Sequence, residues 1–315
     1  MFIDDYLLDQ CKFLKAYQNK FPIKYNKDSN KCAVIIEPRK HELLEAVCRN
    51  VMYFLPSDWN LVVCANDAEY IADILKGIDY AFIHLKYTNL IPEEHSALMM
   101  YEKFWDLIPG EHVLIFQTDS YLCKPLTNEY LESIFKYPYI GGIYQFHKVN
   151  EKDIYEHLDK NKLEFRQKPK FLGGNVSNIY KKELELCNTI NYNFSINGGF
   201  SLRSKKAMLD CIKSISKDNI IEARKKVGLD CSYFELKDII GEDTFYHNAL
   251  DILGYELPDK DKCLEFCTNL PYMDKYTYTS YSVHGFNKFF NDKGRVCLMR
   301  PSLDTFYLDI KKKFE

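Results

Sequence analysis

A lone carboxylate follows an uninterrupted apolar run near the middle of the chain. Residues 113–116 are all apolar, and Gln117, Thr118 and Asp119 come directly after them. Such a run is typical of a buried central strand in a parallel sheet. Ligands of open α/β sheets bind just outside the carboxyl ends of the strands, so Asp119 stands where chemistry is expected. Its oxygens could hold a divalent cation that in turn holds a diphosphate, or they could simply accept hydrogen bonds in a turn.

Two adjacent glycines precede a second short apolar segment. Gly198 and Gly199 stand before residues 200–202, which have the pattern of a strand, and Ser204 suits the N-cap of a helix over 205–215. Glycines let the backbone adopt positive φ or approach a ligand closely. An ordinary turn in front of a strand would look the same, so both interpretations stay open.

A pair of acidic residues opens a later helix. Glu242 and Asp243 follow Gly241 and precede an apolar-periodic helix over 245–253. Two carboxylates here suit a general base with a supporting partner. Acidic residues in a first helical turn are also favoured by the helix dipole alone. Burial would raise the pKa of such a base and the dipole would lower it, and the sequence does not decide between them.

A histidine stands beside a glycine near the carboxyl end of the printed sequence. His284 follows a short apolar segment and is followed by Gly285. A neutral imidazole in this position is a candidate ligand for a metal or a phosphate. A satisfied structural histidine is the alternative interpretation.

Strands and helices alternate regularly between residues 32 and 117. This alternation predicts the sheet that positions the four blocks. The apolar patterns predict strands at 32–36, 61–65, 80–85 and 112–117. They predict helices at 41–55, 68–76 and 93–107. This alternation implies right-handed βαβ units, and therefore an α/β fold with a mixed, mainly parallel sheet. Beyond Asp119 the patterns predict a helix at 126–136 and a strand at 139–144.

The patterns also suggest how the chain is organised. Residues 1–30 have the pattern of an appended helix and a polar linker, and residues 31–315 form one domain. Within that domain, residues 145–195 are polar with weak periodicity. We expect them to form a peripheral insertion that is partly helical.

The composition narrows the class of protein. Hydrophobic residues make up 46% of the 315 residues, which is enough for a sizeable core, and the net charge of −3 gives no reason to expect a nucleic-acid partner. The 11 cysteines are spread singly, which is typical of a reducing compartment. No apolar run approaches the roughly 18 residues of a membrane span. We therefore expect a soluble, cytoplasmic protein without a transmembrane segment.

The blocks, taken in order, resemble the layout of a GT-A glycosyltransferase. From about residue 32 to 290, the chain is similar to a small glycosyltransferase-like family of formerly unknown function, found in large DNA viruses, bacteria and fungi. The segments that carry the resemblance are VIIEPR at 34–39, LIFQTDS at 114–120, YIGG at 139–142, NGGFSLR at 197–203 and EDTF at 242–245. A viral origin would make the compartment the host cytoplasm or the virion.

The resemblance implies a GT-A-like α/β/α sandwich with a single nucleotide-binding core. Asp119 matches the last Asp of the Asp-x-Asp motif that holds a metal on the diphosphate, while Gln117 stands where the first Asp belongs. His284 matches the histidine that completes the metal shell, and the metal would be Mn²⁺ or Mg²⁺. By the same resemblance, the residues that bind the nucleotide-sugar are Glu37 and Arg39 near the nucleobase and ribose, Thr118 and Asp119 near the diphosphate, and Gly198, Gly199 and Phe200 along the donor sugar and acceptor.

The resemblance also assigns the catalytic pair. Asp243 matches the base that takes a proton from the acceptor hydroxyl in inverting enzymes, and Glu242 would support it or contact the acceptor. We therefore expect a glycosyltransferase, hexosyltransferase-like, that moves a sugar from a nucleotide-sugar such as a UDP-sugar to a hydroxyl of a glycan or protein. The first alternative is a catalytically degenerate GT-A fold that binds nucleotide or glycan without turnover, because Gln117 replaces a carboxylate. The second is a nucleotidyltransferase, which the absence of glycine from residues 37–41 disfavours.

Overall fold

A computed structural model of the chain describes residues 3–16, 18–19, 22–145, 194–228, 231–268 and 280–285. Nearly all of the predicted insertion lies outside them. The strands are β1 (Lys31–Ile36), β2 (Asn60–Ala65), β3 (Tyr80–His84), β4 (His112–Phe116), β5 (Ser120–Leu122), β6 (Tyr139–Gln145), β7 (Phe194–Ser204), β8 (Cys267–Thr268) and β9 (Ser282–His284). The helices are α1 (Ile3–Ala16), α2 (Leu44–Phe54), α3 (Ala68–Ile74), α4 (Pro92–Met99), α5 (Glu102–Leu107), α6 (Asn128–Ile134), α9 (Lys205–Ser214), α10 (Lys217–Lys226), α11 (Ser232–Leu236), α12 (Glu242–Ile252) and α13 (Lys260–Phe266).

A six-stranded sheet forms the centre of the described fold, in the order β3-β2-β1-β4-β7-β6. Strands β1 to β4 pair in parallel, and β7 runs antiparallel to both β4 and β6. Five of the six strands therefore point the same way and only β7 is reversed. The predicted α/β class with a mixed, mainly parallel sheet is confirmed. A second, three-stranded sheet has the order β5-β9-β8.

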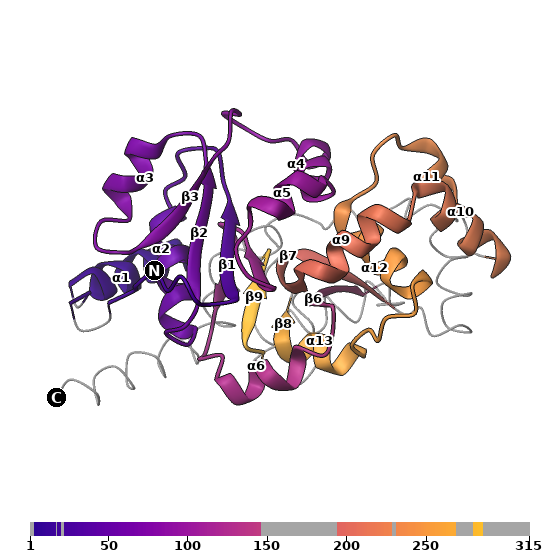
Figure 1. The fold of residues 1–315 in the computed structure, drawn as a ribbon. Helices are drawn as coiled ribbons and strands as arrows, with labels where there is room; N and C mark the ends of the chain where they lie inside the picture. Colours follow the sequence, from indigo (N-terminus) through magenta and orange to yellow (C-terminus); the bar gives the residue numbers. More distant parts are fainter. Residues whose placement is uncertain are drawn as a thin grey trace, which may run out of the picture.

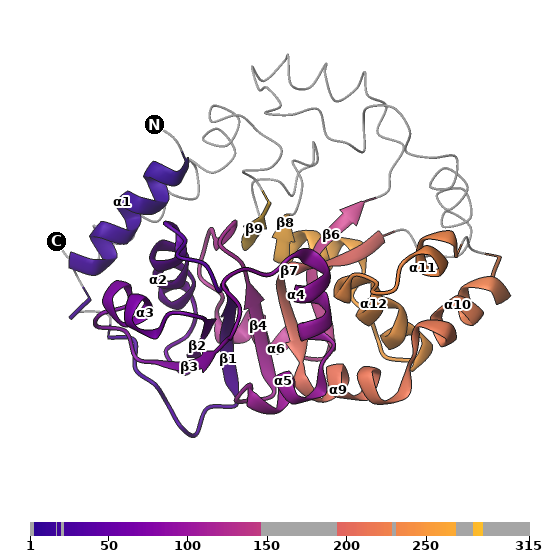
Figure 2. The same cartoon turned by 90° about the horizontal axis from the view of Figure 1, so that it is seen from above.

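Helices cover both faces of the central sheet, which makes three layers. Figures 1 and 2 show α1, α2 and α3 on one face and α4, α5 and α9 on the other. Helix α12 packs on β7 and against α4 and α9. Burial on both faces explains why the central strands are continuous apolar runs, since every residue of β2 is buried. The predicted N-cap Ser204 is confirmed, because its side chain accepts a hydrogen bond from the amide of Ala207.

Helix α1 packs on α2 instead of standing apart from the fold. Its side chains Leu7, Cys11 and Leu14 are buried. The proposed boundary after residue 30 stays a prediction. No helix in the described ranges has the length and apolar character needed to cross a membrane.

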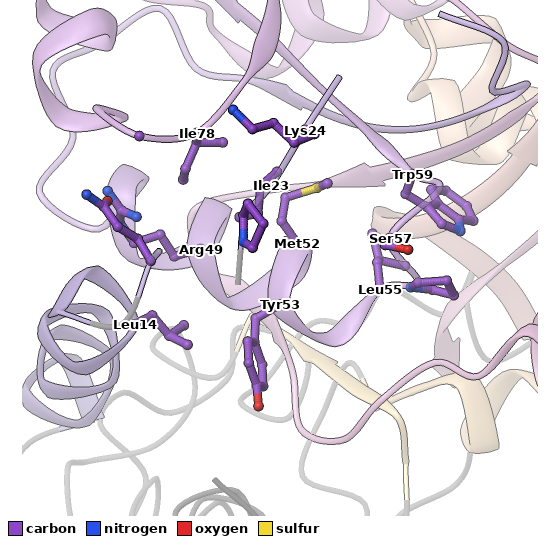
Figure 3. A pocket seen from close by; sticks show the side chains of 14 residues that line it. Leu14, Ile23, Lys24, Arg49, Met52, Tyr53, Leu55, Ser57, Trp59 and Ile78 are labelled. Carbon is purple, nitrogen blue, oxygen red and sulfur yellow. The ribbon is translucent and has the colours of Figure 1, made fainter. Parts of the chain in front are cut away.

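A cavity of about 310 Å³ lies between α1, α2 and the starts of two strands (Figure 3). Its lining includes Leu14, Met52, Tyr53, Trp59 and Ile78. Since Trp59 immediately precedes β2 and Ile78 lies two residues before the start of β3, the cavity lies at the amino ends of these strands. It is therefore at the opposite edge of the sheet from the residues that the sequence singles out.

The single helix predicted over 93–107 is wrong, because the chain breaks between α4 and α5. The carbonyl of Met99 accepts hydrogen bonds from Trp105 Nε1 at 2.7 Å and from Tyr246 Oη at 2.6 Å. In a continuous helix this carbonyl would accept the amide proton four residues later. Side chains from α5 and α12 satisfy it instead, and the break fixes α4 against α12.

We predict that Tyr246→Phe destabilises the protein by about 1–2 kcal/mol, because the buried Met99 carbonyl loses one of its two donors. Chemical denaturation followed by circular dichroism measures this change. Tyr255→Phe is the matched control, since the Tyr255 hydroxyl bonds the half-exposed Asp210 at 2.6 Å. Equal losses in the two variants would contradict the proposed role of the Tyr246 hydroxyl.

Candidate active site

The register of three strands brings the sequence blocks to one edge of the sheet. Ile35 of β1 pairs with Phe116 of β4, and Phe116 pairs with Phe200 of β7. Glu37 therefore leaves β1 beside the residues that leave β4. Because β7 runs in the opposite direction, the residues just before Phe200 lie at this same edge. These residues are Gly198 and Gly199.

Asp119 and His284 meet although 164 residues separate them. Strand β9 pairs antiparallel with β5, so that Ser120 faces His284, and the amide of Gly285 donates to the carbonyl of Asp119 at 3.0 Å. His284 Nε2 lies 3.3 Å from Asp119 Oδ1 and 3.2 Å from Gln117 Oε1. The structure thus brings together the two residues that the resemblance assigns to a metal, and it adds the amide oxygen of Gln117.

The side chain of Ser120 holds the turn after β4. The hydroxyl of Ser120 accepts the amide proton of Gln117 at 2.9 Å and donates to the carbonyl of Gln117 at 2.7 Å. Thr118, within this turn, is buried. The double contact fixes the backbone from which the side chains of Gln117 and Asp119 project.

Glu37 and Arg39 form a tight pair next to this turn. Arg39 Nε and Nη2 donate to the two carboxylate oxygens of Glu37, both at 2.7 Å, and Glu37 is buried. The hydrogen bonds to Glu37 raise the pKa of Arg39 further, and the charge of Asp119 contributes in the same direction. The half-exposed guanidinium of Arg39 therefore lies within electrostatic reach of Asp119.

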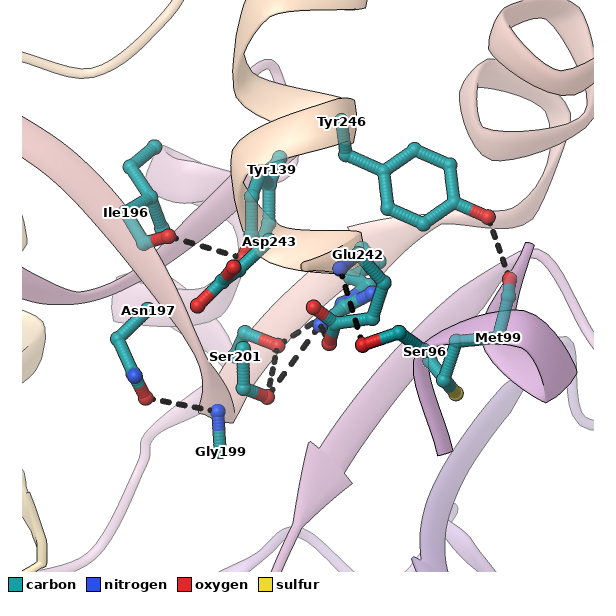
Figure 4. Close-up of polar contacts among 12 residues, drawn as sticks. Ser96, Met99, Tyr139, Ile196, Asn197, Gly199, Ser201, Glu242, Asp243 and Tyr246 are labelled. Carbon is teal, nitrogen blue, oxygen red and sulfur yellow. Dashed lines mark hydrogen bonds and ion pairs between the residues drawn. The ribbon is translucent and has the colours of Figure 1, made fainter. Parts of the chain in front are cut away.

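The two glycines are required by close packing and not by a left-handed backbone. A Cβ atom on Gly199 would collide with the imidazole of His284, and one on Gly198 would collide with Glu242 Oε1 and Arg203 Nη2. The amide of Gly199 donates to Asn197 Oδ1 at 2.8 Å (Figure 4). One dipeptide thus touches both the Asp119–His284 cluster and the acidic start of α12.

The resemblance implies that Phe200 lies along the donor sugar and acceptor, but its side chain points into the core. Its side chain is fully buried and packs against Phe266, with 5.6 Å between the ring centroids. It alternates with its neighbours on the strand and therefore faces the core, not the site. Gly198 and Gly199 remain at the edge of the site.

Glu242 is held by a buried arginine. Its Oε1 lies 2.8 Å from Arg203 Nη2, and the two side chains are 7% and 0% exposed. Arg203 also donates from Nε to Ser201 Oγ at 2.9 Å and from Nη2 to the carbonyl of Gly198 at 3.3 Å. The guanidinium lies 4.8 Å from the ring centroid of Tyr139. Arg203 thus links β7 to the first turn of α12. The sequence patterns assign no role to this residue.

The carboxylate of Asp243 lies in a different environment from that of Glu242. In Figure 4 the Asp243 carboxylate points toward the Asn197 end of β7 and the Glu242 carboxylate toward Ser201. Burial and the charge of Glu242 raise the pKa of Asp243 to about 7, although a 2.7 Å hydrogen bond from the Thr244 amide acts in the opposite sense. A carboxylate with this pKa can both accept and release a proton near neutral pH.

His95 is an ionisable residue near this site that the sequence patterns do not single out. It lies on α4, and its imidazole is partly buried within electrostatic reach of Glu242, Arg203 and Glu37. Burial lowers the pKa of His95, while the charges of Glu242 and Glu37 oppose this shift. The apolar pattern of residues 93–107 gives no sign of this proximity, because it depends on the packing of α4 against α12.

The donor set at the edge fits a hard divalent cation in part. Carboxylate, amide and imidazole groups of Asp119, Gln117 and His284 converge there. Carboxylate and amide oxygens suit Mg²⁺ and Mn²⁺, and imidazole is a common ligand of transition metals. Among the residues that the structure describes, no three His, Cys, Asp or Glu side chains form such a cluster. A cation here would therefore depend on Gln117 and on oxygens of the bound substrate.

Comparison with protein families gives a match over most of this fold. Residues 77–284, more than half of the chain, match the family described as "Protein of unknown function (DUF5672)". The chain belongs to this family. The match spans β4, the two glycines, the start of α12 and His284. No curated protein matches the chain.

Solved structures similar to this DUF5672 member include two glycosyltransferases. One is the apo form of mouse xyloside xylosyltransferase 1, with 11% identity, a TM-score of 0.41, and coverage of 82% of this chain and 98% of the other. Another is the apo form of the bifunctional glycosyltransferase WbbM, with 10% identity, a TM-score of 0.46 and coverage of 88% of this chain. This chain spans half the length of WbbM. The fold class given above rests on the observed sheet topology and not on these two matches.

We predict that Arg203→Met destabilises this DUF5672 member by about 3–5 kcal/mol, because it leaves the Glu242 carboxylate buried without a counter-ion. Urea denaturation measures the loss. Lys136→Met is the control, since Lys136 pairs with Glu256 on the surface, where both side chains are more than half exposed. We expect no measurable change there. A loss in Arg203→Met no larger than in the control would contradict the structural role of the pair.

We predict a pH dependence of stability that Asp243 causes. Its pKa is raised from 3.8 to about 7 in the folded protein, so the folded state holds a proton that the unfolded state releases. The stability of the wild type should therefore fall relative to Asp243→Asn as pH rises from about 4 to 7, by roughly 2–4 kcal/mol. Denaturation curves at several pH values measure the difference. Parallel stability profiles of the two proteins would contradict the raised pKa.

Proposed function

We propose that this protein is a glycosyltransferase that moves a sugar from a nucleotide-sugar to a hydroxyl of a glycan or protein acceptor. A UDP-sugar is the donor we expect, with Mn²⁺ or Mg²⁺ at Asp119 and His284, and with inversion at the transferred carbon. One observation carries the proposal. Gly199 abuts His284 and Gly198 abuts Glu242, so a candidate cation site and a candidate base site lie on either side of one dipeptide.

The charges of the site favour a diphosphate held through a cation. Four carboxylates lie at this edge: Glu37 is paired with Arg39, Glu242 is paired with Arg203, Asp119 Oδ1 lies 3.3 Å from His284 Nε2, and Asp243 lies beside Glu242. The leaving group of a nucleotide-sugar is a diphosphate whose developing negative charge needs stabilisation. A bound divalent cation supplies that stabilisation as a Lewis acid. Asp119 and His284 would hold it, with the amide oxygen of Gln117 as a third ligand.

The remaining nucleotide contacts follow from the register of the sheet. Glu37 and Arg39 leave β1 beside Thr118 and Asp119, which leave β4. A nucleotide whose diphosphate lies at Asp119 would extend its ribose and base over the carboxyl end of β1, in keeping with ligand binding at this edge of α/β sheets. The fork of Arg39 and Glu37 offers both hydrogen-bond donors and acceptors to a nucleobase or ribose.

The raised pKa of Asp243 suits it to the role of the base. Its pKa of about 7 leaves a substantial fraction ionised at neutral pH, so it can take the proton from an acceptor hydroxyl as the bond to the sugar forms. Glu242 is neutralised by Arg203 and cannot approach the acceptor without breaking a buried ion pair. We therefore assign Glu242 the supporting role, through its charge and the position it gives to α12.

A binding module without turnover is the second candidate, and Gln117 favours it. An amide at this position is a weaker cation ligand than the carboxylate that the resemblance leads one to expect. In that case Asp119, His284 and Arg39 would hold the nucleotide, and no sugar would be transferred.

A reducing compartment, and so the cytoplasm, is part of the proposal. The nine cysteines in the described ranges are all buried and form no disulfide. In a disulfide-forming compartment, this many thiols would be open to oxidation while the chain folds.

We predict that UDP with Mn²⁺ raises the thermal midpoint of the wild type, and that Asp119→Ala abolishes the rise. Ligand at 100-fold excess over Kd stabilises the native state by about 2.7 kcal/mol. The measurement is differential scanning fluorimetry with UDP, GDP and UDP-sugars, each with and without Mn²⁺. Asp243→Asn is the matched control, because it should keep the shift and lose sugar transfer. The glycosyltransferase proposal is wrong if no nucleotide shifts the wild type, and the binding-module alternative gains if the shift occurs without donor hydrolysis or transfer.

A further inference from the structure

His284 comes from a strand of only three residues. Strand β9 lies between β5 and β8 in the smaller sheet and ends at His284. Its register with β8 ends at the pair of Thr268 and Val283, whereas its register with β5 reaches His284 itself. Within the described ranges, the sheet therefore holds the backbone of His284 from the β5 side alone. So short a pairing leaves the rotation of the strand about its own axis weakly fixed.

Two serine side chains join β9 to the helix that precedes β8. The hydroxyl of Ser282 donates to the carbonyl of Phe266 at 2.7 Å, and the hydroxyl of Ser280 donates to the carbonyl of Leu264 at 2.5 Å. Both serines are buried. The two carbonyls belong to the last turn of α13, where a helix has no amide of its own to bond them. The serines thus satisfy the end of α13 and tie β9 to it.

The bond of Ser282 also controls where the imidazole points. Ser282 and His284 are two residues apart on β9, and alternate side chains of a strand project from the same face. A hydrogen bond that fixes the Ser282 side chain therefore fixes the rotation of the strand, and with it the direction in which His284 projects.

The imidazole of His284 has little freedom at its far end. The backbone of Gly199 is so close that a Cβ atom there would collide with the ring. On the same nitrogen, Nε2, the ring meets Asp119 Oδ1 at 3.3 Å and Gln117 Oε1 at 3.2 Å. Rotation of β9 would press the ring against Gly199 or withdraw it from Asp119.

The carbonyl that holds Ser282 is itself fixed to the site. The ring of Phe266 packs against that of Phe200, with 5.6 Å between the centroids, and both side chains are fully buried. Phe200 directly follows Gly199 on β7. The anchor of Ser282 and the glycine beside the imidazole therefore belong to one packed unit.

We propose that Ser282 is a positioning residue, whose hydrogen bond to the carbonyl of Phe266 aims the imidazole of His284 at a divalent cation shared with Asp119. This inference rests on the proposed function. Groups that orient a metal ligand without touching the metal typically change the affinity for the metal by 10–100-fold.

The test measures Mn²⁺ binding and UDP binding separately on the full chain. Electron paramagnetic resonance follows free Mn²⁺ in titrations with and without UDP, and calorimetry gives the Kd of UDP at saturating Mn²⁺. The variants are Ser282→Ala, which removes the donor, Ser282→Thr, which keeps it, and His284→Ala with and without Ser282→Ala. Ser133→Ala is the matched control, since the hydroxyl of Ser133 donates to the carbonyl of Tyr130 at 2.6 Å within α6. Thermal midpoints confirm that each variant is folded.

We expect Ser282→Ala to raise the Kd of Mn²⁺ about tenfold and to leave the Kd of UDP at saturating Mn²⁺ unchanged. Ser282→Thr should recover most of the Mn²⁺ affinity, and Ser133→Ala should match the wild type. In the His284→Ala background, Ser282→Ala should change the Kd of Mn²⁺ no further, because the ring that it orients is gone. If Ser282→Ala does not fold, Ser280→Ala, which removes the preceding bond to α13, takes its place with the same expected direction.

A folded Ser282→Ala variant with the Mn²⁺ affinity of the wild type would overturn the inference and leave the proposed function standing. An equal loss of Mn²⁺ affinity with and without His284 would also overturn it, because Ser282 would then act by another route. If the folded wild type binds Mn²⁺ neither alone nor with UDP, the cation of the proposed function is wrong and the inference fails with it.

Discussion

The buried ion pair between Arg203 and Glu242 is the interaction on which the described site depends. Arg203 is fully buried in a β strand, and a guanidinium there is tolerated only with a counter-charge and further hydrogen-bond partners. Glu242 provides the charge, and Ser201 with the carbonyl of Gly198 provides the partners. The pair therefore joins the reversed strand β7 to the first turn of α12. It also holds the Glu242 carboxylate on Arg203, next to Asp243, whose pKa is raised to about 7 by burial and by the charge of Glu242.

Close packing around this ion pair and around His284 explains the two glycines. Any side chain at Gly198 would enter the ion pair, and any side chain at Gly199 would enter the imidazole of His284. Close packing of the glycine backbone thus places the ion pair and the Asp119–His284 cluster on either side of one dipeptide. A cation-assisted leaving group and a base for the acceptor need this kind of proximity, on opposite sides of one sugar.

Much of the fold was predictable, and parts of the site were not. Strands such as 32–36 and 61–65 were found because a sheet covered on both faces needs continuous apolar runs. Asp119 was singled out as a candidate because it follows such a run. The meeting of Asp119 with His284 depends on pairing between β5 and β9, which leaves no local pattern. No sequence pattern singles out His95, because its proximity to Glu242 follows from the packing of α4 against α12. Phe200 shows the converse, since a strand residue next to a site can face the core.

The most direct test of the account is anomalous diffraction from crystals grown with UDP and Mn²⁺. The account predicts a manganese peak bonded to Asp119 Oδ1, to His284 Nε2 and to diphosphate oxygens, with the uridine over the carboxyl end of β1. UDP bound at the cavity between α1 and α2, or a manganese peak away from Asp119 and His284, would contradict the assignment of this edge of the sheet as a nucleotide-sugar site.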